Sequence, residues 1–143
     1  DRSPSRGLGD VYKRQIYTDV MLLKSEAVKR NQTLNLLLFN SGTSNWCYRV
    51  HIDGSCNSCA DACSSIEGRK GVNASEFPGI TLVASYSETA TNIRPLNISP
   101  RRGTLTAGNI AISSGSYAMR VVTNNVGRVR TCAVSNVSGV PTC

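Results

Sequence analysis

The chain has 143 residues, enough for one domain with a hydrophobic core. It carries 16 basic and 9 acidic residues, a formal net charge of +7. No internal repeat or low-complexity tract occurs, and apolar runs such as Leu36–Phe39 are no longer than four residues, far short of the roughly 18 that a bilayer crossing needs.

The first residues differ in kind from the rest of the chain. DVYKRQ back-translates to GAT GTG TAT AAG AGA CAG, which resembles a transposase adapter used in sequencing libraries, and SRGLG lies just upstream. We therefore predict that residues 1–15 are a non-native leader and that residues 16–143 form the domain. The native sequence upstream of Ile16 is expected to be missing.

A helix is predicted from Ile16 to about Asn31. Ile16, Val20, Leu23 and Ala27 recur at i, i+4, i+7 and i+11, which gives one apolar stripe on an otherwise polar helix. Asn31 is a plausible end. The stripe has to pack against another element.

Strands are predicted after the helix, where β-rich segments alternate with loops. We expect loops at residues 40–45, 54–74 and 99–108. The expected strands are Thr33–Phe39, Trp46–Asp53, Ile80–Ser85, Ile93–Ile98, Asn109–Ser113, Tyr117–Thr123 and Arg128–Cys132. A helix followed by antiparallel strands predicts an α+β fold, in which the helix covers one sheet face.

The last two strands form a predicted hairpin that presents arginines. Asn and Gly at residues 124–127 accept the positive φ of tight turns. Arg128 and Arg130, two apart on a strand, are expected on one face, roughly 6–7 Å from each other. Arg120 on the partner strand is a third candidate. Guanidinium groups suit polyanions, because each planar fork grips a phosphate with two hydrogen bonds.

Charge is distributed unevenly along the chain. Residues 16–88 hold six basic and seven acidic groups, whereas no acidic residue follows Glu88 and six arginines do. This asymmetry favours a polyanion-binding face on the C-terminal half, with a solubilising surface as the alternative. Arg101 and Arg102, at a loop tip, are candidates for the same face, or belong to an ordinary charged loop.

Six cysteines in a small chain indicate an oxidising compartment. Cys132 and Cys143 are the simplest pair to propose, and their bridge would stabilise the chain by roughly 3 kcal/mol.

Four further cysteines allow two more bridges. Three connectivities are possible, and the sequence does not separate them. A metal or iron–sulfur site is the less favoured interpretation of the spacing, because the flanking residues resemble a disulfide-pinned loop. These cysteines are Cys47, Cys56, Cys59 and Cys63.

Nothing in the sequence predicts catalysis, a metal or a cofactor. His51 is the one histidine and Asp53 follows two residues later, but no nucleophile motif accompanies them. No phosphate-binding loop or dinucleotide fingerprint occurs. Aromatic residues are few, so base stacking with single strands is disfavoured, and sequence-independent contact with the phosphates of duplex DNA is the better hypothesis.

Three segments resemble the FimT/GspH family of minor type IV pilins and secretion pseudopilins. GRVRTC at Gly127–Cys132, preceded by RVVTNN and followed by a terminal VPTC, resembles the family's C-terminal signature. LLKSEAVKRNQT at Leu22–Thr33 resembles its helix-to-sheet junction, and Pro100–Ile112 its middle hairpin. The resemblance covers about Ile16 to Cys143.

The resemblance implies a pilin-like domain in which the helix is the remnant of a long pilin helix. In the family, the first part of that helix anchors the subunit in the inner membrane and later packs in the filament, after a peptidase removes a short leader. The expected location is therefore the bacterial inner membrane and periplasm, and the assembled extracellular pilus. Other major and minor pilins are the expected partners.

The resemblance also implies a function. In the DNA-uptake branch of the family, the Gly-Arg-x-Arg motif is implicated in binding double-stranded DNA during natural transformation. Here the matching residues are Gly127, Arg128 and Arg130, so the arginines would grip phosphates and the glycine would allow the turn. A Cys132–Cys143 bridge would hold the C-terminal segment against the motif.

A second hypothesis is a structural subunit. In that case the chain is a tip or priming minor pilin, or the H pseudopilin of type II secretion, and binds other pilins rather than DNA. The absence of acids after Glu88 mildly favours an external polyanion.

Overall fold

The structure is a computed structural model that describes residues 4–53, 55–61, 63–66, 68–101, 104–114, 117–134 and 142–143. For residues 4–13 and Tyr117 only the backbone is described. One long helix is followed by strands, which confirms the predicted α+β class. The elements are α1 (Pro4–Arg30), β1 (Leu34–Phe39), β2 (Cys47–His51), β3 (Gly71–Asn73), a 3-10 helix (Ala74–Glu76), β4 (Thr81–Ala84), β5 (Ile93–Ile98), β6 (Gly108–Ser114), β7 (Tyr117–Thr123) and β8 (Val129–Ala133).

Helix α1 begins at Pro4, well before the predicted start at Ile16. The prediction starts late because it sets residues 1–15 aside, whereas their backbone continues the helix from a proline, which suits a first helical position. The non-native origin of residues 1–15 stays a prediction. The helix ends as expected, since Asn31 has a φ of 51° and the N–H of Gln32 donates to the carbonyl of Ala27 (3.1 Å).

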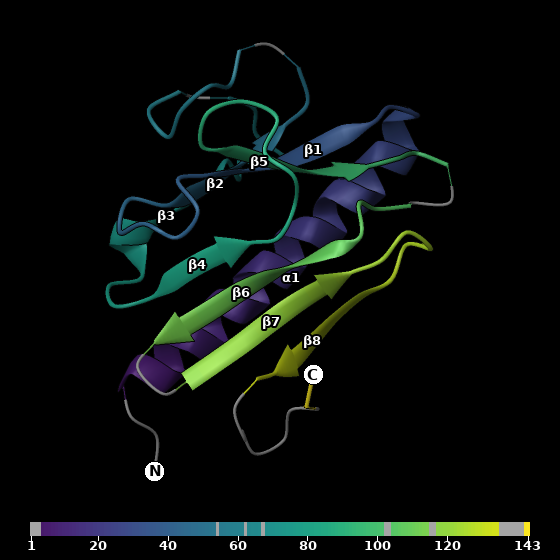
Figure 1. Cartoon of the computed structure of the whole chain (residues 1–143). Coiled ribbons are helices and arrows are strands. Elements are labelled where there is room, and N and C mark those ends of the chain that lie inside the picture. Colours follow the sequence, from purple (N-terminus) through teal and green to yellow (C-terminus); the bar gives the residue numbers. More distant parts are fainter. Residues whose placement is uncertain are drawn as a thin grey trace.

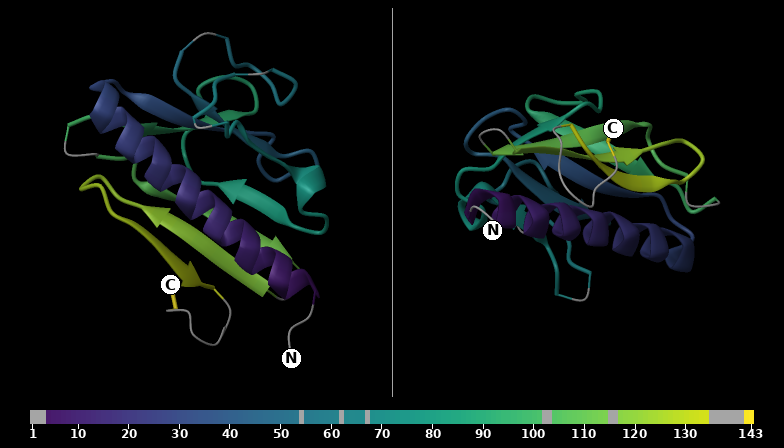
Figure 2. Two further views of the ribbon diagram at one scale, coloured as in Figure 1. Left: turned by 180° about the vertical axis from the view of Figure 1, so that it is seen from behind. Right: turned by 90° about the horizontal axis from the view of Figure 1, so that it is seen from below.

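Two four-stranded antiparallel sheets lie on the same side of α1 (Figures 1 and 2). The first sheet has the strand order β3-β2-β1-β5, and the second sheet has the order β4-β6-β7-β8. The loop between β1 and β2 is hydrogen-bonded to β4 of the other sheet. The N–H of Gly42 donates to the carbonyl of Leu82 (2.8 Å), and the N–H of Ala84 donates to the hydroxyl of Ser41 (2.8 Å). The helix covers one face of each sheet (Figure 2), in agreement with the α+β prediction.

The main core fills the space between α1 and the sheets. The predicted apolar stripe is confirmed, since Ile16, Val20, Leu23 and Ala27 are fully buried. Alternate strand residues meet them from the sheets, as the period of two requires. These include Leu34, Leu36, Leu38, Leu82, Leu96, Ile110, Ile112 and Val121.

A buried carboxylate joins α1 to the loop before β3. Asp19 is 1% exposed and accepts hydrogen bonds from the Tyr48 hydroxyl (2.6 Å) and from Nε and Nη2 of Arg69 (2.6 and 2.9 Å). A tight turn places Arg69, since it exchanges two backbone hydrogen bonds with Ile66 (both 2.9 Å). The bond to Asp19 raises the pKa of Arg69, so the guanidinium stays charged.

The loop region 54–70 holds two disulfides, one that fastens it to β2 on the outer face of the first sheet and one that closes a smaller loop within it. Of the three possible connectivities, the structure has Cys47–Cys59 and Cys56–Cys63. Beneath them, Leu37 and Phe39 form a second, smaller apolar cluster with Cys47 and Cys56. The prediction of loop throughout 54–74 is wrong at its end, because β3 pairs with β2 there.

Arg49 also holds this loop. Its buried guanidinium donates hydrogen bonds to the carbonyls of Tyr48 (2.9 Å) and Cys59 (2.9 Å). Burial lowers the pKa of Arg49, which is the expected effect of removing a cation from water. The loop is thus positioned by hydrogen bonds as well as by disulfides.

Candidate functional site

Asn124 holds the turn between β7 and β8. Its Oδ1 accepts hydrogen bonds from the N–H groups of Val126 (3.2 Å) and Arg128 (3.0 Å). Its own N–H donates to the carbonyl of Arg128 (3.1 Å), and its carbonyl accepts from the N–H of Gly127 (3.1 Å). Gly127 has a φ of 91°, as the turn prediction requires. The sequence predicted the turn, but not that the Asn124 side chain organises it.

Two arginines share the outer face of the second sheet, away from α1. Arg128 closes the turn, so β8 begins at Val129 rather than at Arg128 as predicted. Arg130 lies opposite Val122, and Arg120 lies opposite Cys132. Cross-strand partners share a face, which makes Arg120 and Arg130 diagonal neighbours, about 7–8 Å apart.

The arginines differ in exposure. Arg128 and Arg130 are exposed, whereas Arg120 is half-buried and its Nε has no hydrogen-bond partner in the described part of the chain. Salt bridges within the described residues join Arg69 to Asp19, and Lys29 and Arg30 to Glu26, but none involves Arg120, Arg128 or Arg130. The guanidinium groups of Arg128 and Arg130 are therefore open to solvent, whereas the Nε of Arg120 is buried.

Arg101 lies at the same end of the molecule as the β7–β8 turn. It is exposed, and its N–H donates to the hydroxyl of Ser99 (3.2 Å) in the segment between β5 and β6. Figures 1 and 2 show this segment beside the turn, near the C-terminal end of α1. Arg102 lies outside the described residues. We call Arg101, Arg120, Arg128 and Arg130 the arginine surface.

Lys24 of α1 supports the turn and was not predicted from the sequence. Its Nζ donates a hydrogen bond to the carbonyl of Gly127, which brings another cation to this end of the molecule. The nearby helix acid, Glu26, is already paired with Arg30 (2.8 Å) and Lys29 (3.7 Å). The hydrogen bond from Arg30 lowers the pKa of Glu26, which keeps that pair charged.

The Cys132–Cys143 disulfide is confirmed, but its position differs from the expectation. The N–H of Cys143 donates to the carbonyl of Ala133 (2.9 Å), and Thr142 pairs with Ala133 in parallel. The bridge therefore fastens the chain end to the far end of β8, beside Arg120, and not against Gly127. The reason is the direction of β8, which runs away from the turn.

His51, the one histidine, lies in β2 beside an amide side chain. The Nδ1 of His51 lies 3.3 Å from Oδ1 of Asn35, its cross-strand neighbour. No group of three potential metal ligands occurs among the residues that the structure describes.

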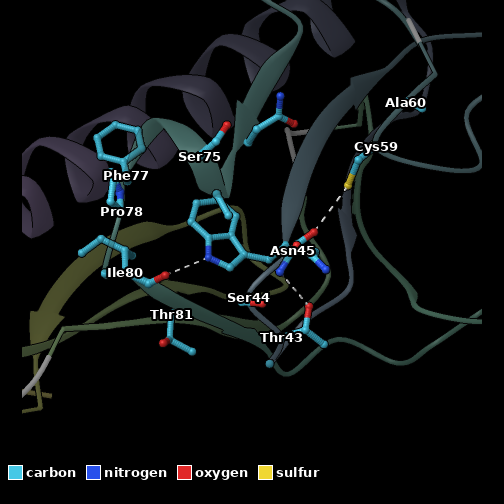
Figure 3. Close-up of a pocket in the computed structure, with 15 residues that line it drawn as sticks. Thr43, Ser44, Asn45, Cys59, Ala60, Ser75, Phe77, Pro78, Ile80 and Thr81 are labelled. Atoms are coloured by element: carbon cyan, nitrogen blue, oxygen red, sulfur yellow. Dashed lines mark hydrogen bonds between the residues drawn. The ribbon is translucent and has the colours of Figure 1, made fainter.

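A hollow of about 710 Å³ lies at the opposite end of the molecule from the β7–β8 turn. Figure 3 shows Phe77 and Pro78 on one side of it and Thr43 and Asn45 on the other. No titratable side chain lines it. The hollow therefore offers no acid–base pair, and we place the candidate site at the arginine surface.

The left-handed backbone at Gly127 leads to a first prediction. Replacing Gly127 with Ala should lower the free energy of unfolding by roughly 1–2 kcal/mol, because a Cβ is disfavoured at positive φ. Urea denaturation measures the change. Val126→Ala, at a side chain 72% exposed, should change it by less than about 0.5 kcal/mol. Equal stability of Gly127→Ala and the wild type would contradict this conformation of the turn.

Comparison with known proteins gives one family. The family model described as type II transport protein GspH matches residues 14–127. The match begins within α1 and ends immediately before Arg128, so it includes the helix from residue 14 onward, all of the first sheet, strands β4, β6 and β7, and the turn, but not β8. No curated protein matches the chain, and no solved structure does.

Proposed function

Since this chain belongs to the family of type II transport protein GspH, we propose that it is a minor pilin that binds duplex DNA through its arginine surface. Family membership itself makes it a minor pilin or pseudopilin of a type II secretion or pilus system, and such pilins are structural rather than enzymatic. The family's proteins interact with other pilins and are membrane-anchored in the periplasm. In the described residues, no helix has the length and apolarity for a bilayer crossing.

The observation that carries the DNA proposal is the exposure of Arg128 and Arg130 without a carboxylate partner. Surface arginines usually lie among acids that reduce the local potential, but no acidic residue follows Glu88 in this chain. Arg101 and Lys24 add positive charge at the same end. A polyanion with regularly spaced phosphates would satisfy several of these groups at once.

The fixed turn favours contacts with the phosphate backbone over recognition of bases. A guanidinium binds a phosphate through two hydrogen bonds. Exposed arginines on a sheet face can therefore bind successive phosphates of a DNA strand without contacting its bases. The turn restrains the backbone that carries Arg128, which reduces the entropy lost on binding. We infer a role in capturing DNA for uptake in natural transformation, at the assembled pilus.

Salt dependence tests this proposal. In fluorescence-anisotropy titrations of the full chain with a short labelled duplex, log Kd should rise with log salt with a slope of about 2–4, if that many phosphates are contacted. A second duplex of unrelated sequence should bind within about threefold, since base edges are not read. An absence of binding at low salt would overturn the proposal.

The alternative is a structural tip or priming subunit, or the H pseudopilin of type II secretion, that binds pilins and not DNA. One observation favours pilin contacts: Tyr17, Met21 and Val28 form an exposed apolar stripe on α1, and they are 37%, 37% and 55% exposed. The stripe and the arginine surface are separate features. One subunit could contact pilins through the stripe and DNA through the arginine surface. If the wild-type chain binds no duplex in the titration, only the structural role is left.

A further inference from the structure

Strand β8 is an edge strand of the second sheet (Figure 1). The N–H of Val134 donates to Ala118, and the carbonyl of Arg128 accepts from Asn124, so even-numbered residues bond toward β7. In an antiparallel ladder the odd-numbered residues then point their N–H and C=O groups away from β7. The carbonyl of Ala133 confirms this, because its partner is Cys143.

This alternation leaves the backbone groups of Val129 and Thr131 directed at the open side of the sheet. Within the described residues, only the chain end pairs with this side of β8, where Thr142 is bridged to Ala133 and the N–H of Cys143 donates to the Ala133 carbonyl. Unpaired edge groups of this kind are a template for an added strand. We call Val129 and Thr131, with their outward backbone groups, the β8 edge.

Helix α1 lies next to the β8 edge and exposes two large apolar side chains, Tyr17 and Met21. A hollow of about 340 Å³ lies between the helix and the strand, lined by Arg14, Tyr17, Thr18 and Thr131. Tyr17 and Met21 are each 37% exposed, and one helical turn separates them on the same stripe. A strand added to β8 would place alternate side chains over these two residues. The hollow gives those side chains space.

The charges beside the edge indicate the chemistry of the added strand. Arg130 extends from the outer face of β8, so it would meet the side chains of the added strand that point away from α1. Such side chains should be acidic, while those toward Tyr17 and Met21 should be apolar. A second copy of β8 fits poorly, because it carries the same arginine and would bring like charges together.

We propose that the β8 edge is a docking site for an extended segment of another pilin subunit, in which apolar and acidic residues alternate. The segment adds a fifth strand to the second sheet and covers Tyr17 and Met21. This inference does not require DNA binding, since the added strand is held by backbone groups on the open side of β8; the two proposals share only Arg130. It assigns contact with another pilin to the β8 edge, by addition of a strand.

A peptide titration tests the proposal directly. The probe is a blocked peptide of about eight residues in which Val and Glu alternate, long enough for one strand. It is added to the full chain, and amide chemical shifts are followed by NMR. We expect shifts centred on Val129, Thr131, Tyr17 and Met21, and slower hydrogen exchange at the first two amides. The matched peptide with Lys in place of Glu should bind at least about tenfold more weakly, because Arg130 repels it.

Two variants separate this site from the rest of the molecule. Thr131→Pro removes one outward N–H but no bond to β7, and proline is tolerated on strand edges. It should weaken peptide binding about tenfold, whereas Thr131→Val, which keeps the N–H, should bind normally. If Thr131→Pro lowers stability, Met21→Glu supplies the second test, since it replaces an exposed apolar side chain that the added strand would cover with a charged one.

Both variants should bind DNA within about twofold of the wild type, so failure of one proposal does not entail failure of the other. Shifts that map to the arginine surface alone, or equal binding of the Glu and Lys peptides, would overturn the docking proposal. Unchanged peptide binding by folded Thr131→Pro and Met21→Glu would do the same.

Discussion

Replacing Asp19 with Ala is expected to lower the free energy of unfolding by roughly 3 kcal/mol. Asp19 is almost fully buried and accepts three hydrogen bonds, one from Tyr48 and two from Arg69. Its removal takes away the carboxylate to which the Tyr48 hydroxyl and the Arg69 guanidinium both donate, and breaking a buried ion pair by removing one partner is strongly destabilising. Urea denaturation at neutral pH measures the difference.

Two controls identify the cause. Asp19→Asn keeps an acceptor for Tyr48 but removes the charge that pairs with Arg69, so its loss of stability should be smaller. Asp53→Ala, at an exposed position, should stay within about 0.5 kcal/mol of the wild type. A stable Asp19→Ala protein would show that the helix and the loop before β3 are not held together by this carboxylate.

The double variant Arg128→Gln/Arg130→Gln should lose roughly 100-fold in affinity for a short duplex at low salt. Each arginine forms charge-assisted hydrogen bonds worth about 1.5–3 kcal/mol with a phosphate, and part of that is recovered by the glutamine amide and by water. The side chains are exposed, so the variant should keep the wild-type stability. Anisotropy titrations beside circular dichroism measure both quantities.

Matched variants separate the contribution of the arginines' charge to duplex affinity from that of the guanidinium geometry. Arg128→Lys/Arg130→Lys keeps the charge but loses the planar fork, and its affinity should fall between those of the wild type and the Gln variant. Lys70→Gln removes an exposed charge beside the first sheet, where the Lys70 carbonyl bonds to Val50 of β2, and should have little effect. If Lys70→Gln weakened binding as much as the arginine changes, net charge rather than the arginine surface would explain the affinity.

Local patterns predicted most of the secondary structure. The stripe from Ile16 to Ala27 is buried as expected, because the period of an amphipathic helix is visible in the residues themselves. The bounds of β5 and β7 agree with the prediction, since β-rich segments there are flanked by turn residues. Strand β3 was not predicted, because three residues are too few to show a period of two. Its strand conformation depends on its pairing with β2.

Long-range contacts could not be predicted in the same way. Asp19 and Arg69 are 50 residues apart, and Lys24 and Gly127 are 103 apart, so only the folded chain brings each pair together. The pairing of the four clustered cysteines depends on how the loop region 54–70 lies on the first sheet. For the candidate site, the sequence predicted the turn and the arginines, but not the contacts by which Asn124 and Lys24 position them.

The most direct measurement is an NMR titration of the arginine Nε–Hε signals of the full chain with a short duplex. The DNA proposal predicts that the signals of Arg128 and Arg130 move first and saturate together, with Arg101 and Arg120 following, while the buried Arg49 and the Asp19-bound Arg69 stay in place. Shifts spread evenly over all exposed arginines, or no shift at Arg128 and Arg130, would contradict it and leave the chain as a structural pilin subunit.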